Sequence, residues 1–183
     1  MQNFRKLKVY IVAKELVKHE KVLEYTSIYE DYLREKTDHK FWLVNTNKLI
    51  RYFEGCDGGK TGFTSEAKFC LSATAERNGL RVVAVVIGAD SSKDRFGAVS
   101  NFFGYAFSNY TAKTIQSKDD CIDNSIRVVR GKTKTINIAT ECDVKALVKK
   151  GDDGEYQLHY QLPEKVKAPI KVGNEIGKAY LTR

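Results

Sequence analysis

Apolar and polar residues alternate in the middle of the chain. From Phe69 to Ala75 the odd-numbered positions are apolar, and the even-numbered ones are small or polar. Arg81–Ile87, R-V-V-A-V-V-I, is a β-branched run typical of a buried strand. Between the two stretches lies Asn78-Gly79, a dipeptide that strongly favours a two-residue hairpin turn. The pattern therefore predicts two antiparallel strands.

Helical spacing of apolar residues flanks this hairpin. Val9–His19 carries an apolar stripe, and Lys48–Phe53 predicts a short helix with capping side chains at Asn45-Thr46-Asn47. A third helix is expected from a cap at Ser92 to about Phe107. Its expected core residues are Phe96, Val99, Phe103 and Phe107. The remaining segments before it are a short strand at Phe41–Val44 and a connector over Val22–Lys36.

The pattern changes after Tyr110, where the apolar segments become short and β-prone. The expected strands are Ile126–Val129, Lys134–Ala139, Val144–Val148 and Tyr156–Leu162, and Ala168–Leu181 ends in another. Turn sequences such as Gly151-Asp152-Asp153-Gly154 separate them. We therefore expect an α+β first domain over residues 1–109 and a small all-β, sandwich-like domain over residues 110–183.

Composition narrows the class of protein. The net charge is +8, but no dense basic run interleaved with aromatic residues is present, so nucleic-acid binding is not expected. No apolar run reaches the length needed to cross a bilayer. Met1–Glu20 lacks the uninterrupted apolar core of a signal peptide, so the chain as written is expected to remain cytoplasmic.

Cysteine and histidine spacing gives no indication of a metal site. The cysteines are Cys56, Cys70, Cys121 and Cys142, and no pair forms a C-x-x-C motif. The three histidines are scattered, whereas zinc sites need clustered ligands. We expect no metal and no cofactor. Cys70 is expected to be a small buried residue of its strand.

The candidate chemistry lies in Gly55–Thr64, G-C-D-G-G-K-T-G-F-T. By itself a K-T-G triplet is weak evidence, because a solvated lysine in a glycine turn has the same sequence. A phosphate-binding loop does not fit, since Glu54 stands where its first glycine belongs and a hairpin follows in place of a helix. Ser65-Glu66-Ala67-Lys68 matches S-x-x-K, but it lies beside a predicted strand, whereas the nucleophile motif needs its serine at the start of a helix. We interpret Ser65 as a turn residue and Lys68 as solvated.

Longer motifs around K-T-G carry a family resemblance. They are N-T-N-K-L at Asn45–Leu49, D-G-x-K-T-G-x-T-S-E-A at Asp57–Ala67, A-T-A-x-R-N-G at Ala73–Gly79 and S-K-x-R-F at Ser92–Phe96. From about Ala13 onwards the chain resembles the low-molecular-mass penicillin-binding proteins that act as serine-type D-alanyl-D-alanine carboxypeptidases. The resemblance implies a partial β-lactamase/transpeptidase-like domain with an antiparallel sheet and helices, followed by a β domain.

The resemblance also implies roles for residues in and near K-T-G. Lys60 would supply positive charge to the cleft, and Thr61 would bind the substrate carboxylate. Gly62 would let the ligand approach the backbone, and the N–H of Phe63 would be an oxyanion donor. Arg95 matches a position near the carboxylate end of the cleft, although a helix-surface arginine is an equal alternative.

Asp57 and Gly59 lie just before the K-T-G motif. We expect Gly55–Gly59 to form a turn that leads into the K-T-G strand, and Asp57 to shape that turn. Gly59 departs from the large apolar residue common before K-T-G in the family, so the packing of this strand is expected to differ locally.

The implied function has one missing part. The upstream S-x-x-K nucleophile motif and the S-x-N motif do not occur in these residues. We expect a D-Ala-D-Ala carboxypeptidase part that binds peptidoglycan stem peptides and β-lactams but is inactive alone. Such a part is also expected to be marginally stable or to self-associate. A non-catalytic cell-wall-binding or assembly module is the alternative. The full-length family works on the extracytoplasmic face of the membrane.

Overall fold

The structure is a computed structural model that describes residues 2–152 and 154–183, with side chains from residue 7 onwards except at 123 and 124. It divides into two compact units, Met1–Asn109 and Tyr110–Arg183. The first unit combines helices with antiparallel strands and the second consists of strands and loops. The predicted α+β class followed by an all-β part is therefore confirmed.

Three antiparallel strands form the centre of the first unit: β3 (Cys56–Thr64), β4 (Lys68–Arg77) and β5 (Leu80–Ala89), in the order β3-β4-β5. The predicted hairpin is confirmed, because Asn78 and Gly79 join β4 to β5 with φ angles of 50° and 74°. A two-residue turn with positive φ at both positions matches the twist of the flanking strands. The predicted turn over Gly55–Gly59 is wrong, since β3 already begins at Cys56.

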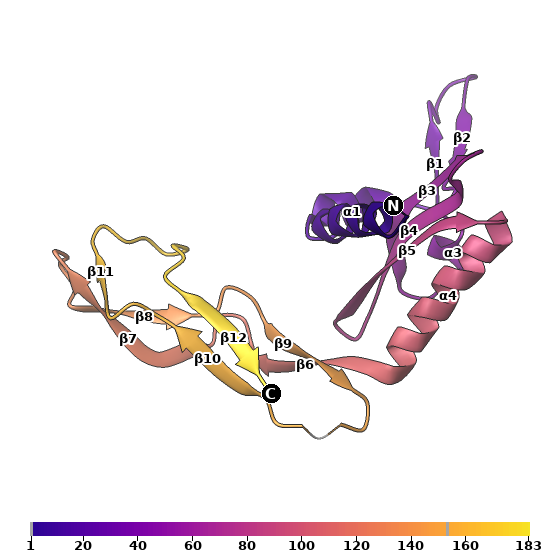
Figure 1. Cartoon of the computed structure of the whole chain (residues 1–183). Coiled ribbons are helices and arrows are strands. Elements are labelled where there is room, and N and C mark those ends of the chain that lie inside the picture. The colour runs from indigo at the N-terminus through magenta and orange to yellow at the C-terminus, as the bar shows by residue number, and fades with distance from the viewer. Residues whose placement is uncertain (1, 153) are drawn as a thin grey trace. The chain divides into compact units, whose positions relative to one another are not determined.

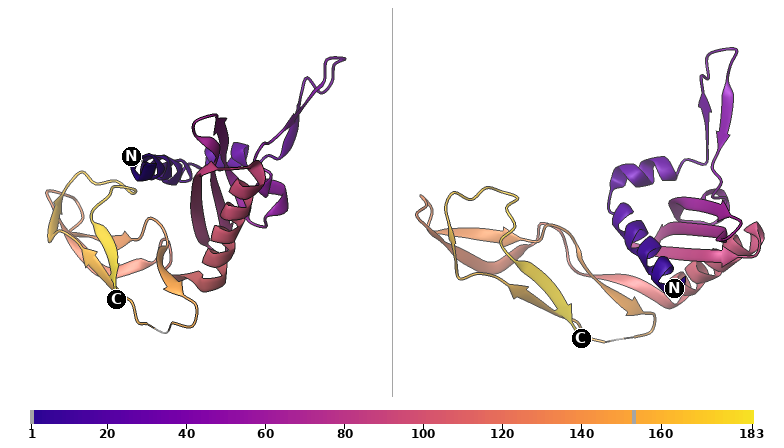
Figure 2. Two further views of the ribbon diagram at one scale, coloured as in Figure 1. Left: turned by 45° about the vertical axis from the view of Figure 1, so that its right-hand side comes forward. Right: turned by 45° about the horizontal axis from the view of Figure 1, so that its top comes forward.

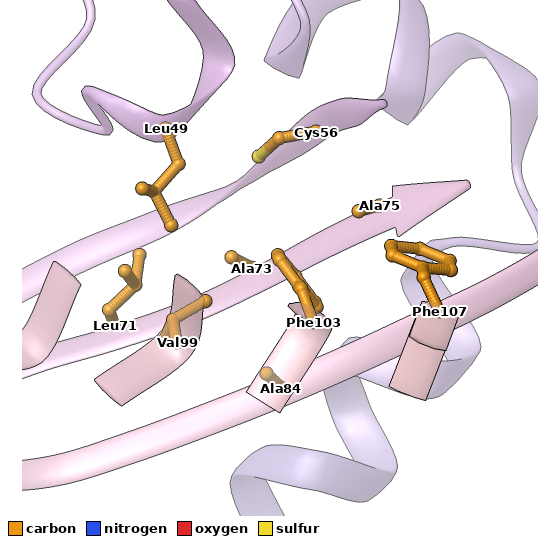
Figure 3. Packing of buried hydrophobic residues seen from close by; sticks show 9 residues of the cluster. All are labelled: Leu49, Cys56, Leu71, Ala73, Ala75, Ala84, Val99, Phe103 and Phe107. Atoms are coloured by element: carbon orange, nitrogen blue, oxygen red, sulfur yellow. The ribbon is translucent and has the colours of Figure 1, made fainter. Parts of the chain in front are cut away.

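Helix α4 (Ser92–Asn109) covers one face of this sheet. Alternate residues of β4 point towards it, and Phe103 of α4 is fully buried among them. Figure 3 shows this core, which comprises Leu49, Cys56, Leu71, Ala73, Ala75, Ala84, Val99, Phe103 and Phe107. The predicted core positions of α4 are confirmed, with Phe96 partly buried at their edge. The cap is Ser91 rather than Ser92, because the Ser91 Oγ accepts the N–H of Asp94 over 3.1 Å.

Helices α1 (Gln2–Leu16) and α2 (Glu20–Thr26) lie on the other face of the sheet from α4 (Figures 1 and 2). The predicted helix over Val9–His19 exists but begins earlier and ends at Leu16. Its apolar stripe is only partly buried, since Ala13 is enclosed whereas Val12 is 57% exposed. The predicted connector over Val22–Lys36 is wrong, because it contains α2 and a strand.

That strand, β1 (Glu30–Leu33), pairs with β2 (Phe41–Val44) in a hairpin that extends away from the main sheet (Figure 1). All eight strand residues are exposed. After it comes the short helix α3 (Leu49–Tyr52), where the predicted capping by asparagine is confirmed: the Asn47 Oδ1 accepts the N–H of Leu49 over 3.2 Å.

Two glycines let neighbouring chain segments approach the start of β3 closely. A Cβ on Gly58 would lie only 3.0 Å from the Cβ of Thr26 at the end of α2. Gly59 has a φ of 118°, and a Cβ there would lie 2.7 Å from the Cα of Ala73 on β4. A large side chain at position 59 is therefore incompatible with this backbone.

The second unit contains seven strands in the part of it that the structure describes. They are β6 (Tyr110–Gln116), β7 (Cys121–Val129), β8 (Thr135–Ala139), β9 (Val144–Lys149), β10 (Gln157–Gln161), β11 (Lys165–Lys167) and β12 (Lys178–Thr182). β6 pairs with β9, β10 with β12, and β7 lies between β8 and β11. Every pair is antiparallel except β11 with β7. Buried Ile126, Ala146 and Val148 form its interior.

Candidate functional site

Lys60 lies near the middle of β3, at the edge of the sheet, opposite Ser72 of β4. Its side chain is on the sheet face that carries α1 and α2. Lys60 is exposed, and the residue contributes to the lining of an apolar cavity of 130 Å³ together with Ala13, Leu23 and Val83. The Lys60 Nζ donates a hydrogen bond to the carbonyl oxygen of Thr61 over 2.7 Å. The lysine therefore lies beside a cavity rather than at the tip of a glycine turn.

Thr61 points to the opposite face of the sheet and is only 8% exposed. Its Oγ1 lies 2.6 Å from the Oγ1 of Thr46, so the N-T-N and K-T-G motifs are in direct contact. The next residue of N-T-N extends this contact, because the Asn47 Nδ2 donates to the carbonyl oxygen of Gly58 over 3.1 Å. The segment before α3 is thus fixed against β3 by side chains from two motifs.

Gly62 and Phe63 occupy the open end of β3. Both are exposed, and a Cβ on Gly62 would meet nothing nearer than the Cβ of Cys70 at 3.8 Å. Packing therefore does not require a glycine at this position. The Phe63 ring is 61% exposed and lies 4.6 Å from the Phe69 ring, centroid to centroid.

Arg95 connects α4 to the K-T-G strand. It is 8% exposed, and its Nη1 donates to the carbonyl oxygens of Gly62 and Cys70 over 3.4 and 3.3 Å. Its Nη2 donates to the Ser92 Oγ over 3.3 Å, and the guanidinium lies 4.8 Å from the centre of the Phe96 ring. Its Nε has no hydrogen-bond partner within the described residues. Arg95 is therefore not a solvated helix-surface arginine.

Asp57 forms an ion pair inside the sheet rather than shaping a turn. Its Oδ2 lies 2.8 Å from the Nη1 of Arg81 on β5. The same Nη1 donates to the Thr74 Oγ1 over 3.0 Å, and the other arm of Arg81 pairs with Glu76. Our reading of the sequence missed Arg81, because only the register of three strands brings these residues together.

The S-x-x-K at Ser65–Lys68 does not form the start of a helix. Residues 65–67 make the turn between β3 and β4, which confirms Ser65 as a turn residue. Lys68 is exposed, as predicted, and it pairs with Asp90. The hydrogen bond from Lys68 lowers the pKa of the Asp90 carboxyl. Ser65 lies in the turn and Lys68 is the first residue of β4. The lysine amine is therefore not placed one helical turn from the serine hydroxyl.

The cysteines show no sign of metal binding in the described residues. No group of three or more His, Cys, Asp or Glu residues is arranged to hold a metal ion there. Cys56 is buried, and its burial raises the pKa of the thiol to about 11. Cys70 is half-buried rather than fully buried, and its Sγ donates to the carbonyl oxygen of Ala67 over 3.2 Å. None of the described helices combines the length and apolarity that a bilayer crossing requires.

A helix-covered antiparallel sheet with K-T-G on its edge strand, followed by an all-β unit, is the arrangement of part of a penicillin-recognising serine enzyme. The chain belongs to the D-alanyl-D-alanine carboxypeptidase family of low-molecular-mass penicillin-binding proteins. Residues 7–91 match the family described as D-alanyl-D-alanine carboxypeptidase. Residues 110–183 match the C-terminal domain of penicillin-binding protein 5.

Relatives of known name agree with this family. The chain is 41% identical over 174 residues to the D-alanyl-D-alanine carboxypeptidase DacF of Bacillus subtilis, covering 94% of this chain and 44% of DacF. It is 31% identical over 125 residues to DacA of Haemophilus influenzae, covering 67% of this chain and 31% of DacA. The chain thus spans less than half the length of these two relatives.

Solved structures agree on the fold. A peptidoglycan synthesis regulatory factor (PBP3) from Streptococcus pneumoniae matches with a TM-score of 0.70 and 28% identity, covering 91% of this chain and 47% of that one. Penicillin-binding protein 5 from Haemophilus influenzae matches with a TM-score of 0.61 and 24% identity, covering 87% and 46%. The latter likeness concerns the fold alone.

Proposed function

We propose that this chain supplies the K-T-G half of the substrate cleft of a serine-type D-Ala-D-Ala carboxypeptidase of peptidoglycan maturation. The observation that carries the proposal is the position of Lys60. The residue lies exposed on an edge strand, beside a cavity that it helps to line, within a segment that matches the carboxypeptidase family. The ligands are peptidoglycan stem peptides that end in D-Ala-D-Ala, and β-lactams that mimic them.

In this proposal Lys60 and Thr61 bind the charged end of the substrate. A stem peptide in extended conformation adds to the outer edge of β3 through main-chain hydrogen bonds. The two side chains leave β3 on opposite faces, but β3 is the edge strand, so a carboxylate at its outer edge would lie between them. The ammonium group of Lys60 attracts this carboxylate, and Thr61 offers its hydroxyl to it. The Thr46 contact orients the Thr61 hydroxyl and leaves it further hydrogen-bonding capacity.

The remaining residues shape the reacting end of the cleft. Gly62 lets the scissile carbonyl approach the backbone, and the N–H of Phe63 donates to the oxyanion that forms during acyl transfer. Arg95 donates a hydrogen bond to the carbonyl oxygen of Gly62 and adds positive charge beside the substrate carboxylate. Because its Nη1 already donates to the carbonyl oxygens of Gly62 and Cys70, we assign Arg95 a role through its charge and the position of β3.

The nucleophile is not among these 183 residues, because the only S-x-x-K lies in a turn and no S-x-N occurs. Without an activated serine there is no acyl-enzyme and no hydrolysis. We therefore propose that the chain alone is inactive. We further propose that the complete cleft works on the extracytoplasmic face of the membrane, where peptidoglycan lies.

Two experiments test these statements. The first incubates the chain with fluorescent penicillin and separates it by denaturing electrophoresis. We expect no labelled band at 20.7 kDa. A labelled band that survives denaturation would contradict the inactivity of the isolated chain.

The second experiment grafts residues 7–91 onto Bacillus subtilis DacF in place of the matching segment. We expect the chimera to be acylated by penicillin. Lys60→Ala in the chimera should slow acylation by about 10²–10³, the loss typical of one electrostatic contact in the transition state. Lys21→Ala, at an exposed position of α2 within the graft, is the matched control and should not change the rate. Equal rates for both variants would exclude the proposed role of Lys60.

A further inference from the structure

The second unit brings two basic segments together on one sheet. β11 runs parallel to β7, and their register places Lys165 beside Arg127 and Lys167 beside Val129. The chain then leaves β7 through the loop 130–134, R-G-K-T-K, which adds Arg130, Lys132 and Lys134. We define the basic face as Arg127, Arg130, Lys132, Lys134, Lys165 and Lys167.

The strand residues of the basic face point outwards together. Ile126 is 4% exposed and lies in the interior, so Arg127 beside it points to solvent. Because paired residues of neighbouring strands share a face, Lys165 points the same way as Arg127, and Lys167 follows two residues later. The end of the face is hollowed. Arg130, Lys165 and Lys167 line a depression with Val129 and Val166.

Nothing on the described part of the chain neutralises these charges. None of the six side chains takes part in an ion pair there. Across residues 126–135 and 163–172 the only acidic residue is Glu164. Like charges placed side by side on adjacent strands reduce stability. An anion bound beside these side chains would relieve the repulsion between Arg127 and Lys165.

We propose that the basic face binds a linear phosphodiester polymer without bases, of the poly(glycerol phosphate) type. Arginine and lysine are the side chains that bind phosphate best, arginine with two parallel hydrogen bonds. A hollow lined by cations suits a chain of phosphates better than the flat surface of a bilayer. A nucleic acid is disfavoured because the two basic segments contain no aromatic residue on which a base could stack. The proposal depends on the second unit alone and is independent of the acyl-transfer cleft.

The test measures binding of the full chain to fluorescein-labelled poly(glycerol phosphate) by fluorescence anisotropy. We expect saturable binding that weakens steeply with added sodium chloride, because bound phosphates release counterions. The triple variant Arg127→Gln/Lys165→Gln/Lys167→Gln should raise Kd by about tenfold or more, since it removes three phosphate contacts. The matched control Lys21→Gln/Lys36→Gln/Lys93→Gln changes net charge equally at exposed positions of the first unit and should bind as the parent does.

Further measurements distinguish the proposed polymer from other anionic ligands. Lys165→Arg/Lys167→Arg keeps the charge and should keep the binding, and circular dichroism melts check that every variant is folded. Equal weakening in the triple variant and its control would overturn the proposal, because attraction would then follow net charge alone. Tighter binding to phosphatidylglycerol vesicles, or to a single-stranded oligonucleotide with the same number of phosphates, would also overturn it.

Discussion

The hydroxyl oxygens of Thr46 and Thr61 lie 2.6 Å apart, at hydrogen-bonding distance. Thr46 belongs to the segment before α3 and Thr61 to the centre of the K-T-G strand. The contact gives the buried Thr61 hydroxyl a fixed partner that does not depend on a ligand. It is therefore a contact whose removal can be measured in the folded chain alone.

We predict that Thr46→Val lowers the free energy of unfolding by about 1 kcal/mol, because the Thr61 hydroxyl loses its partner. Urea denaturation followed by circular dichroism measures the change. Thr133→Val, in an exposed loop of the second unit, makes the same chemical change where no hydrogen bond is lost. If the two variants unfold at the same urea concentration, the hydroxyl contact does not contribute to stability.

Arg95→Met should destabilise the first unit by about 2 kcal/mol, because two carbonyl oxygens lose a charged donor while much of the side-chain packing is kept. Guanidinium chloride denaturation provides the measurement. Lys93→Met, two residues earlier on the exposed side of α4, should have little effect. Ser92→Ala removes only one of the three bonds and should fall between them. An Arg95 variant as stable as the Lys93 variant would mean that the guanidinium does not hold the K-T-G strand.

Gly59→Ala and Gly97→Ala should change stability in opposite directions. At position 59 the added Cβ would meet the β4 backbone in a conformation with φ of 118°, so we expect a loss of about 2 kcal/mol or more. At position 97, inside α4, a Cβ meets nothing within 4 Å. The higher helix propensity of alanine should there add about 0.5–1 kcal/mol. Thermal melts measure the change in melting temperature of each variant. A Gly59→Ala protein that melts at the same temperature as the parent would refute the strained backbone.

Because of Cys56, the free energy of unfolding should decrease as the pH rises into the alkaline range. The unfolded thiol ionises near pH 9, whereas burial holds the pKa of the native thiol at about 11. Between these values the unfolded state binds fewer protons than the native state, so the free energy of unfolding decreases as pH rises. The contribution is fully present below pH 9, and the total loss amounts to about 3 kcal/mol. Urea denaturation from pH 8 to 11 should show a shallower pH dependence in Cys56→Ala. Identical slopes in both proteins would contradict the raised pKa.

Much of the first unit could be predicted from local pattern. Alternation in β4, the Asn78-Gly79 turn and the apolar spacing of α4 each follow from one segment, and each is confirmed. The strand predicted at Phe41–Val44 is confirmed as β2, whereas α2 and β1 within Val22–Lys36 were not predicted, because neither has a buried residue. Without a buried face there is no alternation for a sequence pattern to reveal.

The candidate site was less predictable than the fold around it. K-T-G is local in sequence, so Lys60 could be located from its motif. Its supporting contacts could not, because Thr46, Arg81 and Arg95 reach β3 from three other elements. The glycines before Lys60 do not form the predicted turn: the positive φ of Gly59 occurs inside a strand, next to a shift in the pairing with β4 between Cys56 and Gly58.

The close approach of Gly58 to Thr26 has a consequence for how related chains vary. The two residues come from β3 and α2, and the Thr26 Oγ1 also donates to the carbonyl oxygen of Asp57 over 3.4 Å. A larger residue at position 58 fits only if position 26 becomes smaller or the helix moves. Across homologous sequences these two positions should consequently mutate as a pair, with glycine at one accompanying a branched side chain at the other.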